Sequence, residues 1–371
     1  MSTIHLRLLR RLHGFAGSLV FALALASASG CHHPPSDLMA SPTGAHYSPL
    51  SPSSGALATA LAPVFAQAEK EAGGYLGAAV LHVESGERAT YHGRESFPMQ
   101  SVFKLPLAID VLARVDAGEL RLDEIIHIRP IDVRPGPPNA LADELPPGGG
   151  DRTLLDLVER ILVSSDNTAA DTLLERIGGP AKVTARLRGF GVTGIDVSRS
   201  EAELMMDFCG VTVTPPRDTW TVEGIRAAIR AANLAAPGAR SRALKRYLDD
   251  ARDTATPEAM AYLLVRVHQQ DLLKKASAAR LVSILERVGT GKDRLRGLLP
   301  VGTTVAHKTG TSDETDDITA TTNDAGIITL PGGAGHLIVA AFLADARGDD
   351  AARAHAIALV ARAAYDHYAP R

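Results

Sequence analysis

Strand-like segments occur in two widely separated parts of this 371-residue chain, and a long helical stretch lies between them. Residues 75–83 and 88–92 read as strands on either side of the turn 84–86, which predicts a hairpin. Three further strands are predicted near the other end of the chain, at 302–309, 325–330 and 336–344. We therefore expect an α/β fold with two lobes, in which an antiparallel five-stranded sheet with flanking helices accompanies a mostly helical lobe.

Helical patterns set the expected limits of the two lobes. Helices are predicted at 57–71, at about 101–116, over much of 151–189, from the Thr256-Pro257 start signal onward, and at 349–368. The folded domain should cover residues 57–371. Its α/β lobe is expected at about 57–116 and 257–371, and its helical lobe at about 117–256.

The first 31 residues have the features of an export signal. A basic patch at residues 7–11 precedes an apolar run at 15–28, which is too short for a stable bilayer-spanning helix. Small residues then lead to Cys31, in an order that resembles a bacterial lipoprotein cleavage site. We expect a periplasmic protein with a lipid anchor on Cys31, or alternatively simple secretion. Residues 32–56 are rich in Pro, Ser and Gly, which predicts a disordered linker.

Composition excludes several classes of protein. The 39 Lys+Arg and 42 Asp+Glu give a net charge of 39 − 42 = −3, which argues against a nucleic-acid partner. Two cysteines exclude a disulfide scaffold and a cysteine-based zinc cluster. None of the 13 histidines falls in an H-E-x-x-H or comparable array, so we expect no metal and no organic cofactor.

Three short motifs carry candidate chemistry. Ser101 and Lys104 lie three residues apart at a predicted helix start, on one face of the helix. A neutral Lys amine beside a Ser hydroxyl can take its proton and so activate a weak nucleophile. The alternative interpretation is a helix cap followed by a solvated Lys.

The other two motifs offer complementary groups. Ser165-Asp166-Asn167 follows a helical run and supplies a second hydroxyl and an amide, although it also suits a polar turn. Lys308-Thr309-Gly310-Thr311 ends a predicted strand and supplies a cation, a hydroxyl and a glycine that allows close approach to the backbone.

These three motifs, in this order, resemble the signature of class A β-lactamases and penicillin-binding proteins. The chain resembles class A β-lactamases over residues 57–371, and the segments 165–171, 253–260 and 297–311 add to the match. The resemblance implies the β-lactamase/transpeptidase fold and a serine hydrolase that opens the β-lactam amide of penicillins and cephalosporins. It also implies a monomer whose partners are β-lactam small molecules.

The resemblance further implies a role for each motif residue. Ser101 is the implied nucleophile and Lys104 the acylation base, although whether Lys or Glu takes that proton is disputed. Ser165 would pass a proton to the leaving nitrogen, and Asn167 would contact the acylamino side chain. The substrate carboxylate would bind to Lys308 and Thr309. The backbone N–H groups of Ser101 and Thr311, beside Gly310, would form the oxyanion hole.

A β-lactamase also needs a base that activates water. Arg199-Ser200-Glu201 fits the family pattern, so Glu201 takes this role by resemblance, and its alternative is a solvated acid in a loop. Arg199 would pair with Asp253 to close that loop. Arg294 resembles the Arg that some class A enzymes use for the substrate carboxylate, and a surface Arg is the alternative.

The sequence departs from the family pattern at three places. Asp171 stands where most class A enzymes have Asn, as in a subgroup active on extended-spectrum cephalosporins. Met205 replaces an Asn that usually helps to hold the hydrolytic water. Residues 206–251 enlarge the omega loop and should contain helices at about 222–233 and 241–251. This insertion is expected to be a packed helical hairpin or a lid over the pocket.

Two further functions stay open at this point. A penicillin-binding or DD-peptidase-like enzyme would acylate and release slowly, which Met205 and the insertion favour and Glu201 disfavours. A β-lactam-binding envelope lipoprotein without hydrolysis is the other alternative, and the intact Ser101 and Lys104 argue against it.

Overall fold

The computed structural model describes residues 55–235 and 238–369, which belong to one unit of the chain, residues 44–371. The predicted signal peptide at 1–31, with its lipidation site Cys31, lies outside the described residues. So does the predicted linker at 32–56, apart from Gly55 and Ala56 at the start of the first helix. No helix in the described ranges is both long enough and apolar enough to cross a membrane.

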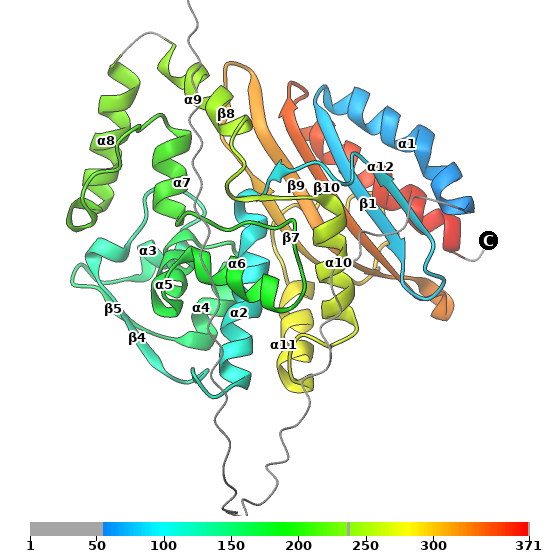
Figure 1. Ribbon diagram of the computed structural model, residues 1–371, viewed down its shortest axis with the longest axis horizontal. Helices are drawn as coiled ribbons and strands as arrows, with labels where there is room; N and C mark the ends of the chain where they lie inside the picture. Colours follow the sequence, from blue (N-terminus) through cyan, green and yellow to red (C-terminus); the bar gives the residue numbers. More distant parts are fainter. Residues whose placement is uncertain (1–54, 236–237, 370–371) are drawn as a thin grey trace, which may run out of the picture. The chain divides into compact units, whose positions relative to one another are not determined.

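The predicted strands form one antiparallel sheet in the order β2-β1-β10-β9-β7 (Figure 1). A sixth strand of two residues, β8, pairs with the start of β9. Strands from both ends of the chain are therefore neighbours, as the sequence predicts. The bounds are β1 Tyr75–His82, β2 Arg88–Tyr91, β7 Val305–Thr311, β8 Glu314–Thr315, β9 Ile318–Thr329 and β10 His336–Ala346.

Strand β9 begins seven residues before the predicted start at residue 325. Its first half is rich in Thr, Asn and Asp, which does not look like a buried strand in the sequence. These polar side chains are nevertheless buried. Asn323 shows how this is possible, because its Nδ2 donates to the backbone oxygens of Pro98 (2.8 Å) and Met99 (3.0 Å). The sheet thereby holds the segment that leads to Ser101.

Alternate residues of the central strands face two different cores. On β10, Leu337, Val339 and Ala341 pack with helices α1 (Ala56–Ala72) and α12 (Asp350–Tyr368). Their neighbours on the same strand face the opposite core, which includes α10 (Pro257–His268) and α11 (Lys275–Glu286). The sheet is thus covered by helices on both faces (Figure 1).

The helix predicted at about 101–116 is divided into the 3₁₀ turn η1 (Gln100–Phe103) and α2 (Lys104–Asp116). The start of α10 agrees with its capping signal, because Thr256 Oγ1 accepts from Ala259 N at 3.1 Å and Pro257 is the first helical residue. The middle of the chain is mostly helical. It contains β4 Ile125–Ile128, α3 Ala140–Glu144, β5 Gly150–Thr153, α4 Leu154–Val163, α5 Asn167–Ile177, α6 Pro180–Gly189, α7 Glu201–Phe208, α8 Val222–Leu234, α9 Ala239–Leu248 and β6 Thr254–Ala255.

The insertion at 206–251 forms its two predicted helices, α8 and α9. Leu244 and Tyr247 of α9 are buried against Phe208 at the end of α7 and Ala320 of β9. Cys209 is a free cysteine, buried in the same cluster. The inserted helices therefore pack both on α7 and on one end of the sheet.

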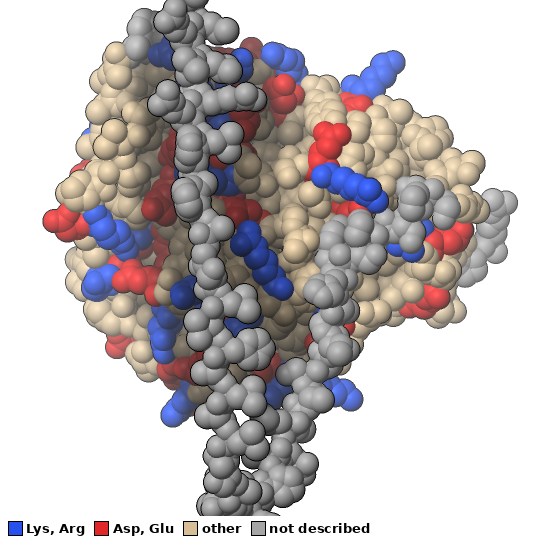
Figure 2. All heavy atoms as spheres, viewed as in Figure 1, with Lys and Arg blue, Asp and Glu red and all other residues tan. Residues whose placement is uncertain are grey.

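Basic and acidic side chains are interspersed on the face of the described part seen in Figure 2. Many form close ion pairs there and elsewhere, as Arg160 does with Glu144 at 2.7 Å. Mixed charge of this kind creates no large field of one sign.

Candidate active site

Lys104 is the central residue of the candidate site. Its side chain is fully buried at the start of α2, and its Nζ lies 3.0 Å from Ser101 Oγ. The same Nζ donates to the backbone oxygen of Ser165 and to Asn167 Oδ1, each at 2.6 Å. Glu201 Oε1 lies 2.7 Å away. A buried amine requires such partners, and here they are the groups singled out by the sequence motifs.

Ser101 lies in η1 and keeps partial solvent exposure, in contrast to the buried Lys104. Strand β7 passes close to its backbone at Gly310. A Cβ on Gly310 would lie 2.4 Å from Met99 O and 3.2 Å from Ser101 N, so only glycine fits there. Gln100, just before Ser101, has a φ of 45°. Backbone in this region is unusual for a residue other than glycine, and such strain is often found at functional sites.

Ser165 occupies the turn between α4 and α5 with a φ of 61°. The next residue, Asp166, fixes this turn: its Oδ1 accepts from Ala169 N at the start of α5, and its Oδ2 accepts from Leu141 N, both at 2.8 Å. Ser165 Oγ accepts from Lys308 Nζ at 3.0 Å and lies 3.4 Å from Lys104 Nζ. The second hydroxyl thus lies between the two buried amines.

Lys308 lies on β7 with its side chain fully buried, and its Nζ also donates to Thr309 O at 2.8 Å. Burial lowers the pKa of this amine well below 10.5, and the nearby Lys104 lowers it further. Two positive charges this close in a buried site are unfavourable, so the amine more readily gives up its proton.

The rest of the Lys-Thr-Gly segment contacts a loop after α11. Thr309 Oγ1 lies 2.5 Å from Thr290 Oγ1. Arg294 donates from Nη2 to Thr311 Oγ1 at 2.7 Å and from Nη1 to Gly310 O at 3.2 Å. Burial lowers the pKa of Arg294. Arg294 is thus attached to the Lys-Thr-Gly strand, whereas the contact of Thr290 was not foreseen from the sequence.

Glu201 is the first residue of α7, and two interactions hold that end of the helix. Ser200 and Glu203 form a capping box, in which Glu203 Oε2 accepts from Ser200 N at 2.8 Å. Asp171 Oδ1 accepts from Glu201 N at 2.6 Å. Asp171 also pairs with the buried Arg134, Nε to Oδ2, at 2.5 Å. The sequence drew attention to Asp171 but not to Arg134.

The pair expected between Arg199 and Asp253 is present, with 2.5 Å between Nε and Oδ2. The same guanidinium reaches two acids of the insertion, Asp207 at 2.5 Å and Asp250 at 3.1 Å. Both ends of the insertion are therefore tied to the residue that closes the Glu201 loop.

Two residues of the enlarged loop lie close to this centre. Met205 packs with Trp220 and Ile225 of the insertion, so it adds apolar surface to α7. Tyr247 of α9 is buried, and its hydroxyl accepts from Gln100 Nε2 at 2.8 Å. Helical spacing places Tyr247 on the buried face of α9, but no local pattern connects it with Gln100.

The structure brings the expected residues together in two adjoining groups. Direct contacts of Lys104 and Lys308 connect Ser101, Ser165, Asn167 and Glu201. Arg294, Thr309, Gly310 and Thr311 form the second group, which adjoins Ser101 through Gly310. A partly exposed hydroxyl beside an amine and a carboxylate is suited to forming an acyl-serine and then hydrolysing it.

Comparison with known proteins agrees with this chemistry. The model of the β-lactamase enzyme family matches residues 56–368. The chain belongs to this family. The extended-spectrum β-lactamase PER-1 of Pseudomonas aeruginosa is 32% identical over 293 residues, which cover 78% of this chain and 81% of PER-1.

Solved β-lactamase structures extend the comparison. A β-lactamase from Chitinophaga pinensis is 33% identical with a TM-score of 0.67, covering 82% of this chain and 99% of its own. An ancestral class A β-lactamase is 36% identical with a TM-score of 0.66, covering 84% and 100%. The resemblance to class A β-lactamases and the fold expected from the motifs are confirmed.

Proposed function

We propose that this member of the β-lactamase family hydrolyses the β-lactam amide of penicillins and cephalosporins through an acyl-enzyme on Ser101. The observation that carries the proposal is the position of Lys104 Nζ, 3.0 Å from Ser101 Oγ and 2.7 Å from Glu201 Oε1. One amine thus connects the group that attacks the lactam with a carboxylate able to activate water.

In the acylation step, Ser101 Oγ attacks the lactam carbonyl carbon and gives its proton to Lys104, whose ammonium proton Glu201 has accepted. The alternative, in which Glu201 takes the Ser101 proton through a water, uses the same contacts. The carbon–nitrogen bond breaks as Ser165 Oγ passes a proton to the nitrogen and draws a replacement from Lys104. Glu201 then returns its proton to Lys104, so the carboxylate is charged again before deacylation. Backbone N–H groups of Ser101 and Thr311 stabilise the oxyanion.

In the deacylation step, Glu201 takes a proton from a water as the water oxygen attacks the ester carbon. The bond between that carbon and Ser101 Oγ then breaks, and Ser101 Oγ takes a proton from Lys104, which recovers one from the protonated Glu201. Asp171 and the capping box at Ser200 hold Glu201 at the start of α7. Met205 adds no hydrogen-bonding group for the water, so Glu201 and Ser101 must hold it.

Binding of the substrate is assigned to the polar edge of β7 and to Asn167. Lys308, Thr309 and Arg294 would bind the carboxylate that penicillins and cephalosporins carry. Asn167 would hold the acylamino side chain by its amide. Asp171 favours extended-spectrum cephalosporins as substrates, a range that also appears in the name of the related PER-1.

A chromogenic cephalosporin tests the proposal. We expect multiple turnovers by the wild-type enzyme, none by Ser101→Ala, and a lasting acyl-enzyme detected by mass spectrometry in Glu201→Ala. A single burst by the wild-type enzyme, with a stable adduct on Ser101, would instead support a penicillin-binding or sensor protein.

We further propose a monomeric periplasmic protein, anchored by a lipid on Cys31. The basic patch, the apolar run and the small residues before Cys31 support this location. Mass spectrometry of the mature N-terminus after expression in a bacterial host should show a diacylglyceryl group, and Cys31→Ala should release the protein from the membrane fraction. An unmodified N-terminus in a soluble periplasmic protein would leave simple secretion.

A further inference from the structure

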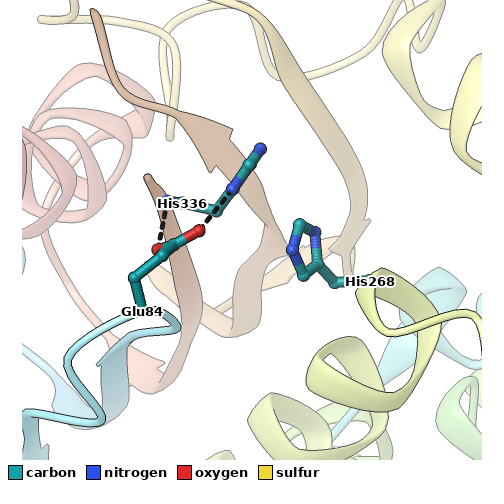
Figure 3. A group of neighbouring side chains, drawn as sticks. All are labelled: Glu84, His268 and His336. Atoms are coloured by element: carbon teal, nitrogen blue, oxygen red, sulfur yellow. Dashed lines mark hydrogen bonds and ion pairs between the residues drawn. The ribbon is translucent and has the colours of Figure 1, made fainter. Parts of the chain in front are cut away.

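Two imidazoles and a carboxylate meet at the end of the sheet beyond the active site. Glu84 lies in the turn after β1, His268 ends α10 and His336 begins β10 (Figure 3). His336 pairs with Thr329 of β9, four residues from the partner of Lys308 on that strand. Four residues of a strand span about 13 Å, so this group is separate from the catalytic contacts.

The three side chains can offer one ligand atom each. These atoms all lie within 4.8 Å of one another, and they are the only such group of three or more His, Cys, Asp or Glu residues among residues 55–235 and 238–369. Zinc bonds of about 2.0–2.1 Å place tetrahedral donors roughly 3.4 Å apart, so modest side-chain rotation would close the site. Two His and one Glu form a donor set that Zn²⁺ uses in proteins.

Neighbouring groups already orient the carboxylate. Glu84 Oε2 accepts from His336 N at 2.7 Å, and Glu84 Oε1 lies 2.8 Å from His336 Nδ1. Burial would raise the pKa of Glu84, but these hydrogen bonds outweigh it and lower the pKa. His82 Nε2 approaches Glu84 Oε2 at 3.4 Å from another side. A charged, oriented carboxylate is what a metal ligand needs.

Of the three side chains, His268 is the one whose ring nitrogens are still available to bind a ligand. Its half-buried ring lies 4.3 Å from that of His336, and within the described part of the chain its nitrogens have no hydrogen-bond partner. Its ring nitrogens are therefore open to a further partner, and a neutral His nitrogen is a common metal ligand.

Both histidines also line a surface cleft of about 350 Å³ that includes Ser283 and Glu286. The cleft leaves room for water on the open side of the group, which a three-ligand metal site requires.

We propose that Glu84, His268 and His336 bind a divalent transition-metal ion of the Zn²⁺ type. The ion would tie together the hairpin turn, the end of α10 and the start of β10. A search for short metal-binding motifs in the sequence cannot find such a site, because Glu84 and His336 lie 252 residues apart in the chain. The expectation of no metal rested on local histidine spacing alone.

Equilibrium dialysis of the untagged, EDTA-treated protein against Zn²⁺ tests this proposal, with Co²⁺ absorption as a second readout of coordination. The variants are His268→Asn and Glu84→Gln. The matched control is His127→Gln, because exposed His127 also contacts a carboxylate, Asp151 at 2.7 Å, but belongs to no three-ligand group of the described chain.

At micromolar Zn²⁺, we expect the wild-type protein and His127→Gln each to bind one more equivalent of Zn²⁺ than His268→Asn and Glu84→Gln. In these two site variants, the affinity for that Zn²⁺ ion should be at least tenfold lower. Zn²⁺ should raise the melting temperature of the wild type and of His127→Gln only, while all four proteins melt alike in EDTA. Equal stoichiometry and Co²⁺ spectra in all four proteins would overturn the proposal and leave a simple His–Glu ion pair. Cephalosporin hydrolysis in EDTA should be unchanged in each variant, so this outcome is independent of the proposed catalysis.

Discussion

The catalytic centre and the inserted helices are attached to the molecule in different ways. Lys104 and Lys308 are fully buried, and both donate to groups of Ser165, a residue from a distant segment. Lys104 also donates to Ser101 Oγ and Asn167 Oδ1. The insertion is held by two small apolar clusters, by the acids around Arg199, and by a few single contacts such as that of Tyr247. The comparison indicates that the catalytic side chains are held by the sheet and its adjoining helices, whereas the insertion is attached around them through few contacts.

The largest expected effect is a loss of activity when a Lys is replaced by Met in the catalytic centre, compared with the same replacement in the insertion. Lys104→Met removes a buried amine from the centre and should lower kcat/KM for a chromogenic cephalosporin by about a thousandfold, the scale of a lost acid–base group. Lys245→Met changes an exposed residue of α9 and should leave kcat/KM unchanged. Retention of a tenth of the activity in Lys104→Met would contradict the assignment.

Two ion pairs on α5 provide the next comparison, in stability. Asp171→Ala leaves the buried Arg134 without its partner and should cost about 3–5 kcal/mol in urea unfolding. Glu175→Ala removes the exposed partner of Arg217, which precedes α8, and should cost less than about 1 kcal/mol. Equal losses would show that the insertion is anchored as firmly as the catalytic loop.

The decline of activity at high pH should come from a group of the catalytic centre, Lys308, and not from the insertion. Because its pKa is well below 10.5, Lys308 is charged at low pH and loses its charge as the pH rises through that lowered value. At pH values above this pKa, the uncharged Lys308 should bind the substrate carboxylate less well. We therefore expect kcat/KM to fall by up to about tenfold per pH unit.

Lys308→Arg keeps its charge and should lose this alkaline decline, although its absolute activity will be lower. Replacing residues 208–250 by a short linker should leave the decline in place. A profile that stays flat in the wild-type enzyme up to pH 10.5 would refute the role of Lys308.

The smallest expected effect lies at the contact between the two regions. Tyr247→Phe removes one hydrogen bond to Gln100, the residue before Ser101, and should lower kcat two- to fivefold with little change in KM. As a control, Tyr91→Phe removes a hydroxyl that donates to Glu69 Oε2 of α1 at 2.7 Å, and it should leave kcat unchanged. An unchanged kcat in Tyr247→Phe would mean that α9 only packs against the centre.

The same comparison shows how far sequence reasoning reaches. The strand segments predicted from the sequence match every strand of the sheet except the short β8. The family resemblance, carried by the three motifs and by Arg199-Ser200-Glu201, implied the side chains that meet at Lys104. The polar half of β9 was missed, because burial of Asn323 depends on backbone oxygens of a distant segment.

Other contacts were missed for the same physical reason. Arg134 looks like any charged residue until Asp171 is placed beside it, and Tyr247 looks like an ordinary core residue of an amphipathic helix. A partner chosen by tertiary packing leaves no local periodicity, so it cannot be inferred from one sequence alone.

The close approach of β7 to the nucleophile also limits how this enzyme can evolve. Any Cβ at residue 310 would lie only 2.4 Å from Met99 O. Every single substitution of Gly310 would therefore push β7 away from the segment that carries Ser101. Changes in substrate range have more room at residues around that point, such as exposed Thr311 next to it or the inserted helix that contacts Gln100. New substrates would then be reached by substitutions around the contact between Gly310 and the Ser101 segment, while the contact itself stays the same.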